Sequence, residues 1–380
     1  MTSSFLGGMT PDAFLSEYWQ KKPLLVRQAV PGFISPVSPD AFLDLATRPD
    51  AATRLIVEEG GAYPWELMEG PFDPDELDPV PGDVWSMLIQ EMDRMDPAVH
   101  ALWKHVSFLP NWRLDDIMVS LASPGGGVGA HIDNYDVFLL QGHGRRRWQI
   151  GLSPVDEEVL IPDLDVSILA DFTADAEWVL EPGDMLYLPP RFAHYGVALD
   201  TCMTFSFGCR APSAVELTGA LLEQAMTGLD PDRRYGDPDL KAATVPGVLD
   251  DAPLAFARGL LAEVAAEADR TLGMVLTEPR RYAELDAGPE LTPDELQARL
   301  AGGERLHGLA PYQVLHRLAP GGDVLRLFVR GECLELDASF EPFARALCSV
   351  EGAGAEDVQD DPVLLDLLVE LVAEHLLLLR

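Results

Sequence analysis

Hydrophobic and polar residues alternate with a period of two along residues 115–210, in short runs separated by glycine and proline. Side chains of a strand point alternately to its two faces, so this period predicts β-strands with one face toward a core. Several short strands joined by tight turns are typical of a barrel or a sandwich. We expect a hairpin joining the second and third of these strands, and place the strands at 116–122, 135–141, 145–152, 176–189 and 202–210.

The apolar residues recur at helical spacing before this β region. Thr10 followed by Pro11 has the sequence of a helix N-cap with proline at the first helical position. A second short helix is expected at 38–46, and a brief strand at 54–59. Residues 84–95 also have helical periodicity, and we expect a helix there.

Helical spacing returns after the β region. Residues 213–285 predict helices, and Thr292 with Glu295 forms the capping box of another helix. A hairpin is expected at 324–337, and an amphipathic helix from residue 364 to the C-terminus. Helices around a small hairpin suggest a winged-helix-like module. We therefore predict an α+β chain in three parts: the β region with its N-terminal helices at 1–210, a helical segment at 211–287, and a winged-helix-like domain at 288–380.

The composition is strongly acidic. The 380 residues include 63 acidic and 27 basic ones, for a formal net charge of −36. Nucleic-acid binding needs a basic footprint, so this charge argues against general affinity for nucleic acids. Residues 290–380 contain no lysine, which counts against DNA binding by the winged-helix-like part. A generally acidic surface explains most of the charge, and it also suits a basic protein substrate drawn in by electrostatic steering.

Neither cysteines nor apolar runs indicate a secreted or membrane protein. The four cysteines form no CxxC pair, which favours reduced thiols over a disulfide framework or a zinc site. The N-terminal residues lack the features of a secretory signal, and no apolar run is long enough to cross a bilayer. We expect a cytoplasmic protein without membrane association.

His131 and Asp133 are the strongest candidates for chemistry. They lie two residues apart in a strand-like segment after a glycine-rich loop, so both side chains would project from one face. A later segment, GDMLYLPPRFAH, ends on His194 with the spacing of cupin-type barrels. Two histidines and a carboxylate leave coordination positions open, as in non-haem Fe(II) oxygenases. We predict that these three residues bind a catalytic metal, with manganese or zinc in an isomerase-type cupin as the competing assignment.

Arg146 belongs to a run of three arginines that begins at residue 145. Alternation places it on the same face as Trp148 and Ile150, toward the interior, and leaves its two neighbours at a solvated edge. An unpaired internal charge is very costly, so a buried guanidinium needs an anion. The distal carboxylate of 2-oxoglutarate matches its bidentate fork, and the 2-oxo acid end would occupy the open positions on iron.

Two further residues are candidates for this site. Ser120 lies on the strand before the glycine-rich loop and would support the same carboxylate or make an ordinary core hydrogen bond. Tyr135 follows Asp133 by two and should face inward, either as a packed aromatic residue or beside the substrate. The glycine-rich loop at 125–129 is not a phosphate loop, because no Lys-Ser/Thr pair and no helix follow it. Its glycines would instead allow close backbone approach.

These motifs identify a family. The segments YWQKKPLLVRQA, SPGGGVGAHIDNYDVFLLQGHGRRRWQIG and LEPGDMLYLPPRFAHYGVAL together resemble the bacterial JmjC-type ribosomal oxygenases. The resemblance covers the whole chain and is most specific in the β region. It is closest to the branch that hydroxylates an arginine in the sixteenth protein of the large ribosomal subunit. Members that hydroxylate histidine typically have lysine where this chain has Arg146, which favours the arginine branch.

The resemblance implies a fold and a reaction. The fold is a double-stranded β-helix (a cupin/JmjC barrel), followed by a helical dimerisation segment and a winged-helix-like domain that does not bind DNA. Fe(II) would be held by His131, Asp133 and His194, and 2-oxoglutarate by Arg146 with help from Ser120. With O2, a homodimer would hydroxylate the β-carbon of one arginine in a basic ribosomal protein.

Two other functions stay open at this point. The first is the same oxygenase chemistry on a histidine, on another protein residue or on a small molecule. The second is a non-catalytic cupin that acts as a binding or regulatory protein and touches DNA through its winged helix.

Overall fold

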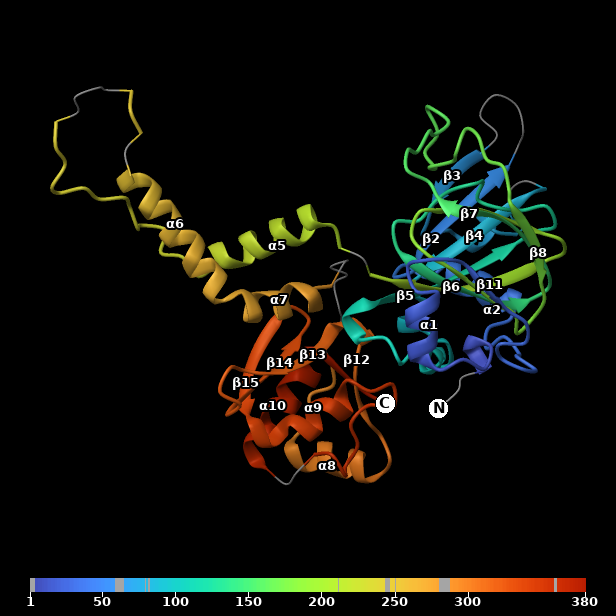
Figure 1. Cartoon of the computed structure of the whole chain (residues 1–380). Coiled ribbons are helices and arrows are strands. Elements are labelled where there is room, and N and C mark those ends of the chain that lie inside the picture. The colour runs from blue at the N-terminus through green and yellow to red at the C-terminus, as the bar shows by residue number, and fades with distance from the viewer. Residues whose placement is uncertain are drawn as a thin grey trace. The chain divides into compact units, whose positions relative to one another are not determined.

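The computed structural model divides into two compact units, Met1–Ala211 and Pro212–Arg380 (Figure 1). It describes residues 4–58, 65–78, 80, 83–210, 212–242, 247–249, 251–279, 288–358 and 361–380. Each unit is described by itself below. No helix within these described ranges is long and apolar enough to cross a membrane.

The first unit is built on two β-sheets (Figure 1). The larger has eight strands in the order β1 (Leu24–Val26), β9 (Met185–Leu188), β6 (Asp136–His143), β11 (Cys202–Cys209), β5 (Leu114–Ala122), β4 (Trp85–Gln90), β2 (Ala52–Glu58) and β3 (Trp65–Glu69). The smaller has the order β10 (Phe192–Ala198), β7 (Arg146–Pro154) and β8 (Ala176–Leu180). Every pairing within them is antiparallel.

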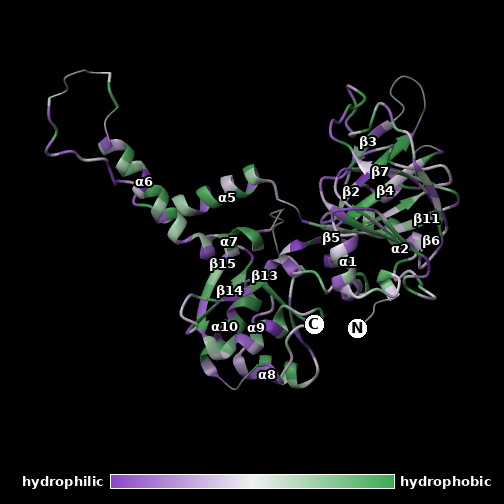
Figure 2. Cartoon of the chain, in the orientation of Figure 1, coloured by the Kyte–Doolittle hydropathy of each residue, from purple (hydrophilic) through white to green (hydrophobic). Residues whose placement is uncertain are grey.

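The two sheets face each other across a shared apolar core. Val137 and Leu139 of the larger sheet and Trp148 of the smaller one belong to a single buried cluster. Residues that alternate with Val137 and Leu139 point to the opposite face of β6, so Phe138 packs outside the barrel. Figure 2 shows hydrophobic residues along these strands. The β region is therefore a double-stranded β-helix, as expected.

The N-terminal helices cover the outer face of the larger sheet. In α1 (Pro11–Glu17), the Thr10 hydroxyl accepts a hydrogen bond from the Ala13 amide, which confirms the predicted cap. Phe14 of this helix is fully buried, and its ring lies 5.7 Å from that of Phe138. The second predicted helix is also confirmed as α2 (Pro39–Ala46), and shorter helices complete the layer: α3 (Met92–Met95) and α4 (Pro97–His100).

Three local predictions for the first unit are wrong. The expected strand at 176–189 is two strands, β8 and β9, which lie in different sheets. The expected hairpin at 135–151 does not form, because β6 pairs with β9 and β11 whereas β7 pairs with β8 and β10. Gly144, with a φ of 57°, lies in the turn that carries the chain from one sheet to the other. The expected helix at 84–95 is instead strand β4 followed by the single-turn helix α3. β4 is paired on both sides and buries residues on both of its faces. Its apolar residues therefore do not alternate with polar ones, and their spacing is similar to that of a helix.

The second unit begins with three helices, α5 (Ala214–Met226), α6 (Asp251–Ala266) and α7 (Ala268–Thr277). The rest comprises α8 (Pro293–Ala301), β12 (Leu306–Gly308), β13 (Val314–Leu318), β14 (Val324–Val329), β15 (Glu332–Asp337), α9 (Glu341–Leu347), α10 (Pro362–Ala373) and β16 (Leu377–Leu379). The predicted hairpin is β14–β15, with β13 as a third strand, and the predicted capping box of α8 is present.

Two features of this unit differ from the expectations. The amphipathic C-terminal helix ends at Ala373, and the last leucines form β16, which pairs with β12. The helix α7 packs against the sheet: the Thr277 hydroxyl accepts a hydrogen bond from the Gly331 amide at 3.0 Å. The helix α7 therefore belongs with the winged-helix-like domain, and residues 280–287, which contain the expected domain boundary, lie outside the described residues. The boundary at residue 287 and a dimerising role for residues 211–287 stay predictions.

Candidate metal centre

The structure brings His131, Asp133 and His194 together. One potential ligand atom from each residue lies within 4.8 Å of the other two. The His194 Nε2 atom is 3.6 Å from an Asp133 carboxylate oxygen, and the two imidazole centroids are 4.2 Å apart. These residues therefore form the three-residue cluster that their spacing predicts.

A backbone bridge holds the two histidines side by side. The His131 amide donates to the His194 carbonyl at 3.0 Å, and the His194 amide donates to the His131 carbonyl at 2.9 Å. His194 lies in β10, but His131 is an isolated bridge residue rather than part of a regular strand, and β6 begins only at Asp136. The predicted strand through His131 and Asp133 is thus a single bridge in an extended loop, which still places both side chains at the centre.

Both imidazoles are oriented by carbonyl groups. The Nδ1 of His131 lies 3.0 Å from the Gly129 carbonyl oxygen, and the Nδ1 of His194 lies 2.9 Å from that of Phe192. A carbonyl only accepts, so each Nδ1 carries the proton and each Nε2 lone pair is free for a metal. Carbonyl partners of this kind fix the tautomer and ring direction of metal-binding histidines.

Burial keeps His194 neutral. Its side chain is only 3% exposed, and burial together with the neighbouring His131 lowers its pKa to about 4. The Trp148 ring lies 5.8 Å from the His194 ring and forms part of this apolar wall. A neutral imidazole is the form that binds a metal, so His194 is prepared for coordination at neutral pH.

The donor set fits an open metal site. Two imidazole nitrogens and a carboxylate oxygen on one side of an ion leave the opposite positions to other ligands, which is the arrangement of non-haem iron oxygenases. Asp136 follows the predicted ligand Asp133 by three residues and is fully buried. Its oxygens accept hydrogen bonds from the Tyr187 hydroxyl at 2.6 Å and from Arg113 at 3.0 Å, at the point where the ligand loop enters β6.

Arg146 points inward, as alternation predicts. It is 4% exposed, and its neighbours on the same strand face, Trp148 and Ile150, are buried with it. Its Nε and Nη2 atoms are buried without a hydrogen-bond partner in the described part of the chain. The guanidinium carbon of Arg146 lies 5.7 Å from the centre of the Trp148 ring. A buried guanidinium without a hydrogen-bonded anion destabilises the folded protein, so this site fits a carboxylate ligand.

Ser120 shares the inner face of the barrel with Arg146. β11 pairs with β5 so that Thr204 lies opposite Ser120, and β6 places Gln141 opposite Thr204. Directly opposed residues of an antiparallel pair share a face, so Ser120 faces the interior at the end of the barrel near Ala122. Ala122 packs on Ala198, the β-sheet partner of Arg146. Ser120 and Arg146 therefore lie toward the same end.

Tyr135 lies at the mouth rather than in the core. It is 41% exposed, which excludes the packed inward aromatic residue that we expected as one alternative. Burial of its hydroxyl end and the nearby Asp133 carboxylate raise the pKa of the Tyr135 phenol. The negative charges of Asp116 and Asp115 contribute to the same increase.

Asp116 is a candidate that the sequence patterns did not single out. It follows the inward register of Met118 and Ser120 on β5, at the end of the strand nearer Tyr135. Burial, Asp115 and Asp93 raise its pKa to about 7. Asp116 is half-buried, and its carboxylate accepts a hydrogen bond from the Glu91 amide at 2.9 Å. An incoming cation would stabilise the charged form of a carboxyl group that has acidic neighbours. Only the tertiary structure reveals this environment.

The glycine-rich loop packs tightly against its surroundings, as expected. A Cβ on Gly126 would lie 2.1 Å from the Trp85 carbonyl oxygen, and one on Gly127 would lie 2.7 Å from that of Gly196. Side chains at these positions would push the loop away from β4 and β10, which line the barrel.

Comparisons with known proteins agree with this geometry. A JmjC domain model matches residues 101–217, and a ROXA-like winged-helix model matches residues 261–377, which include α7. The ribosomal protein uL16 3-hydroxylase of Escherichia coli is 34% identical over 371 residues, 95% of each chain. A probable ribosomal oxygenase of Haemophilus influenzae is 34% identical, over 86% of this chain and 82% of its own.

A solved structure is similar along the whole chain. YcfD, a ribosomal oxygenase from Escherichia coli solved in complex with cobalt and 2-oxoglutarate, superposes with a TM-score of 0.81 at 31% identity, and the match covers 98% of both chains.

The metal cluster gives a direct prediction. Asp133→Ala removes the only anionic donor of the three, so Fe(II) affinity should fall at least 100-fold, on the scale of lost ligands and their supports. Anaerobic calorimetric titration with Fe(II) measures this. Asp165→Ala, an exposed carboxylate elsewhere on the same unit, is the control and should bind like the wild type. Equal affinity in both variants would show that Asp133 is not a ligand.

Proposed function

The chain belongs to the JmjC ribosomal oxygenase family, and from this premise we propose that it hydroxylates an arginine side chain of the large-subunit ribosomal protein uL16 at the β-carbon. The proposal rests above all on one observation. An open cluster of two histidines and a carboxylate shares a barrel interior with a buried guanidinium that has no hydrogen-bond partner among the described residues.

Different residues of the barrel interior bind the metal and the cosubstrate. His131, Asp133 and His194 hold Fe(II) on one side, and Arg146 binds the distal carboxylate of 2-oxoglutarate with help from Ser120. Bound together, iron and 2-oxoglutarate supply with O2 the oxidising power for C–H hydroxylation. The protein fixes the imidazole tautomers, directs the dicarboxylate by a charge-assisted fork and surrounds both with apolar strands that exclude water.

The carboxylates at the mouth receive the substrate. The charges of Asp133 and Asp116 both act on the Tyr135 phenol, so a cationic side chain that enters here would meet an aromatic ring and negative charge together. An arginine would ionise Asp116 fully, because a guanidinium within hydrogen-bond reach opposes the effects that raise its pKa. A long cationic side chain held at its tip leaves its β-carbon nearer the metal.

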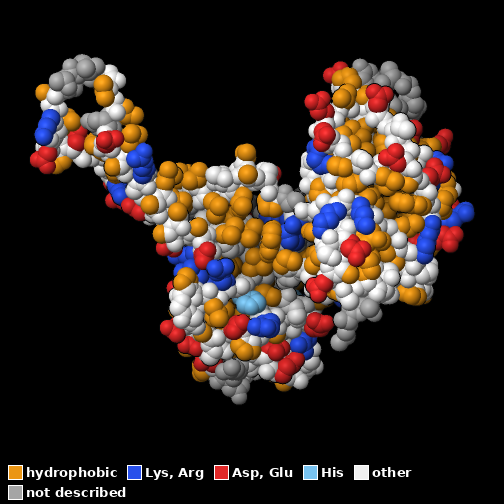
Figure 3. All heavy atoms as spheres, viewed as in Figure 1, with side chains coloured by type: hydrophobic (Ala, Val, Ile, Leu, Met, Phe, Trp, Pro, Cys, Tyr) orange, Lys and Arg blue, Asp and Glu red, His pale blue; other side chains and the backbone are white. Residues whose placement is uncertain are grey.

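A homodimer is supported by the exposed apolar residues of α5 and α6. Neither helix buries any residue within its own unit. Val215, Leu222 and Met226 of α5 and Leu261 of α6 are all exposed, and Figure 3 shows apolar side chains gathered over α5. Contiguous apolar surface of this kind marks an interface, and these two helices are those expected to mediate dimerisation. A ribosomal substrate further implies action in the cytoplasm.

The proposed reaction adds one oxygen atom to uL16. Purified protein with Fe(II), 2-oxoglutarate and O2 should increase the mass of uL16 by one oxygen, and fragment masses should assign it to an arginine. Asp116→Asn should lower kcat/KM by about 10-fold through the lost charge pair, on the scale of 1–2 kcal/mol for such bonds. An oxygen on a histidine would instead support the alternative substrate class, and no added mass would reject the substrate.

The role of Arg146 is tested by the cosubstrate alone. Arg146→Met keeps an apolar stem of similar length and removes a buried charge, so the free protein should be as stable as the wild type or more stable. 2-Oxoglutarate with Mn(II) should raise the thermal midpoint of the wild type but not of this variant. Arg147→Met, on the other strand face, is the control and should respond like the wild type. A normal response of Arg146→Met would remove Arg146 from the cosubstrate site.

The dimer interface is tested by charge. Leu222→Glu with Leu261→Glu places carboxylates in the apolar surface and should convert a dimer to a monomer in light scattering. Val363→Glu, at a more exposed position on α10, should leave the mass unchanged. A wild-type mass of one chain would reject the dimer.

A further inference from the structure

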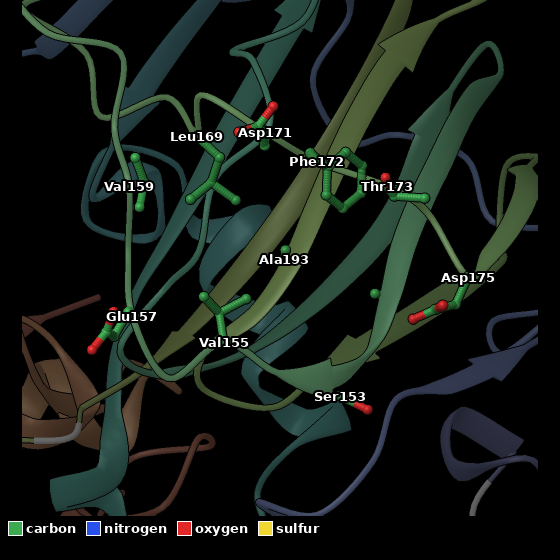
Figure 4. Close-up of a pocket in the computed structure, with 11 residues that line it drawn as sticks. Ser153, Val155, Glu157, Val159, Leu169, Asp171, Phe172, Thr173, Asp175 and Ala193 are labelled. Atoms are coloured by element: carbon green, nitrogen blue, oxygen red, sulfur yellow. The ribbon is translucent and has the colours of Figure 1, made fainter.

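A hollow lies on the outer side of the smaller sheet, away from the barrel interior (Figure 4). Its volume is about 280 Å³. The floor is formed by Gly151 of β7 and Ala193 of β10, and the walls by the segment 155–175 that connects β7 to β8. Ala193 and His194 are consecutive in one strand, so their side chains point to opposite faces. The hollow is thus separated from the metal cluster by the thickness of β10.

The walls of this pocket are apolar and partly open. Apolar side chains line the hollow, among them those of Val155, Val159, Leu169 and Phe172 (Figure 4). Leu169 is buried and Phe172 half-buried, and both pack with Ala130 and Ala193. Val159, by contrast, is 63% exposed. The pocket therefore offers apolar surface to a partner that is not part of its own unit.

The rim of the pocket is acidic. Glu157, Asp171 and Asp175 lie around its edge (Figure 4). The whole segment 155–175 contains seven acidic residues and no lysine, arginine or histidine: Asp156, Glu157, Glu158, Asp163, Asp165, Asp171 and Asp175. An apolar hollow with a ring of carboxylates complements a long basic side chain, whose methylene groups bury themselves while the charged end stays at the rim.

Backbone contacts connect the pocket to the mouth of the metal site. The Leu169 amide donates to the Ala130 carbonyl at 2.8 Å, next to His131. On the other side, the Arg191 amide donates to the Asp133 carbonyl at 2.7 Å, and its guanidinium donates to the Val155 carbonyl at 2.7 Å. The pocket and the ligand loop therefore share one rim of the barrel, and an extended peptide that crosses this rim reaches both.

We propose that this pocket binds a lysine or arginine side chain of the substrate protein, at a position other than the residue that is hydroxylated. The proposal deepens the proposed function and rests on it, since a basic ribosomal protein is the partner. The mouth would select the reacting side chain, and the pocket would hold a second cationic residue of the same extended segment. Two sites on one rim would fix the direction of the peptide as well as its affinity.

Kinetics with two substrates test this proposal. The double variant Glu157→Lys with Asp171→Lys reverses two rim charges at exposed positions. For full-length uL16 its KM should rise about 5- to 10-fold, with kcat unchanged, because rim charges act on encounter and binding rather than on the chemical step. A short peptide that carries the modified arginine as its only basic residue should show the wild-type KM. Val159→Ser should raise KM for uL16 by about 2-fold through lost apolar contact.

A matched control separates the pocket from the general acidity of the surface. Glu158→Lys with Asp165→Lys makes the same charge change in the same segment, at exposed positions that do not line the pocket. Its KM for uL16 should stay within 2-fold of the wild type. Equal KM increases in the two double variants would overturn the pocket, and so would an unchanged KM in the first.

Direct binding keeps this proposal distinct from the proposed function. Labelled uL16 is titrated with the wild type and with both double variants. If the wild type adds no oxygen to uL16, the proposed function fails, yet a loss of binding confined to the pocket variant would still support the docking site. If all three proteins bind uL16 equally, or if none binds it, the docking site is rejected.

Discussion

The metal centre depends on two backbone hydrogen bonds between His131 and His194. They join a loop of one sheet to a strand of the other and so determine the distance between two imidazoles that lie 63 residues apart in the sequence. The carbonyls of Gly129 and Phe192 then set the ring tautomers. Because backbone groups do both tasks, the ligand geometry tolerates change in the surrounding side chains. What it does not tolerate is displacement of the loop, which the buried Asp136 and the close-packed glycines prevent.

A second constraint is the cationic charge inside the barrel. Arg146 costs stability while its guanidinium has no anionic partner, and apolar residues of similar size would pack there more favourably. A ligand carboxylate that paired with this guanidinium would remove that cost. Under the proposed function, a dicarboxylate would match both this guanidinium and a metal held by the cluster, whereas a monocarboxylate would match only one of them. The interior of this barrel is therefore organised by charge as much as by apolar packing.

Short-range patterns in the sequence predicted the chemistry better than the strand pairing. The metal ligands and the inward direction of Arg146 follow from spacings of two to five residues and from alternation. Both depend only on an extended backbone and not on which strands pair. The prediction of a hairpin at 135–151 was wrong because β6 and β7 enter different sheets, and contacts between residues distant in sequence determine this pairing. The prediction of a helix at 84–95 was wrong because β4 buries residues on both of its faces. Asp116 and the outer pocket escaped notice because their environments arise only where segments distant in sequence meet.

The winged-helix-like domain is also strongly acidic. Residues 288–380 carry 17 acidic residues and seven arginines. Several of these arginines pair within the domain, among them Arg299 with Glu304, Arg305 with Glu356 and Arg326 with Glu335. Guanidinium groups paired in this way, among an excess of carboxylates, present no positive potential to a phosphate backbone. This excess of carboxylates would suit the cationic protein partner of the proposed function better than a phosphate backbone, as would the acidic rim of the first unit.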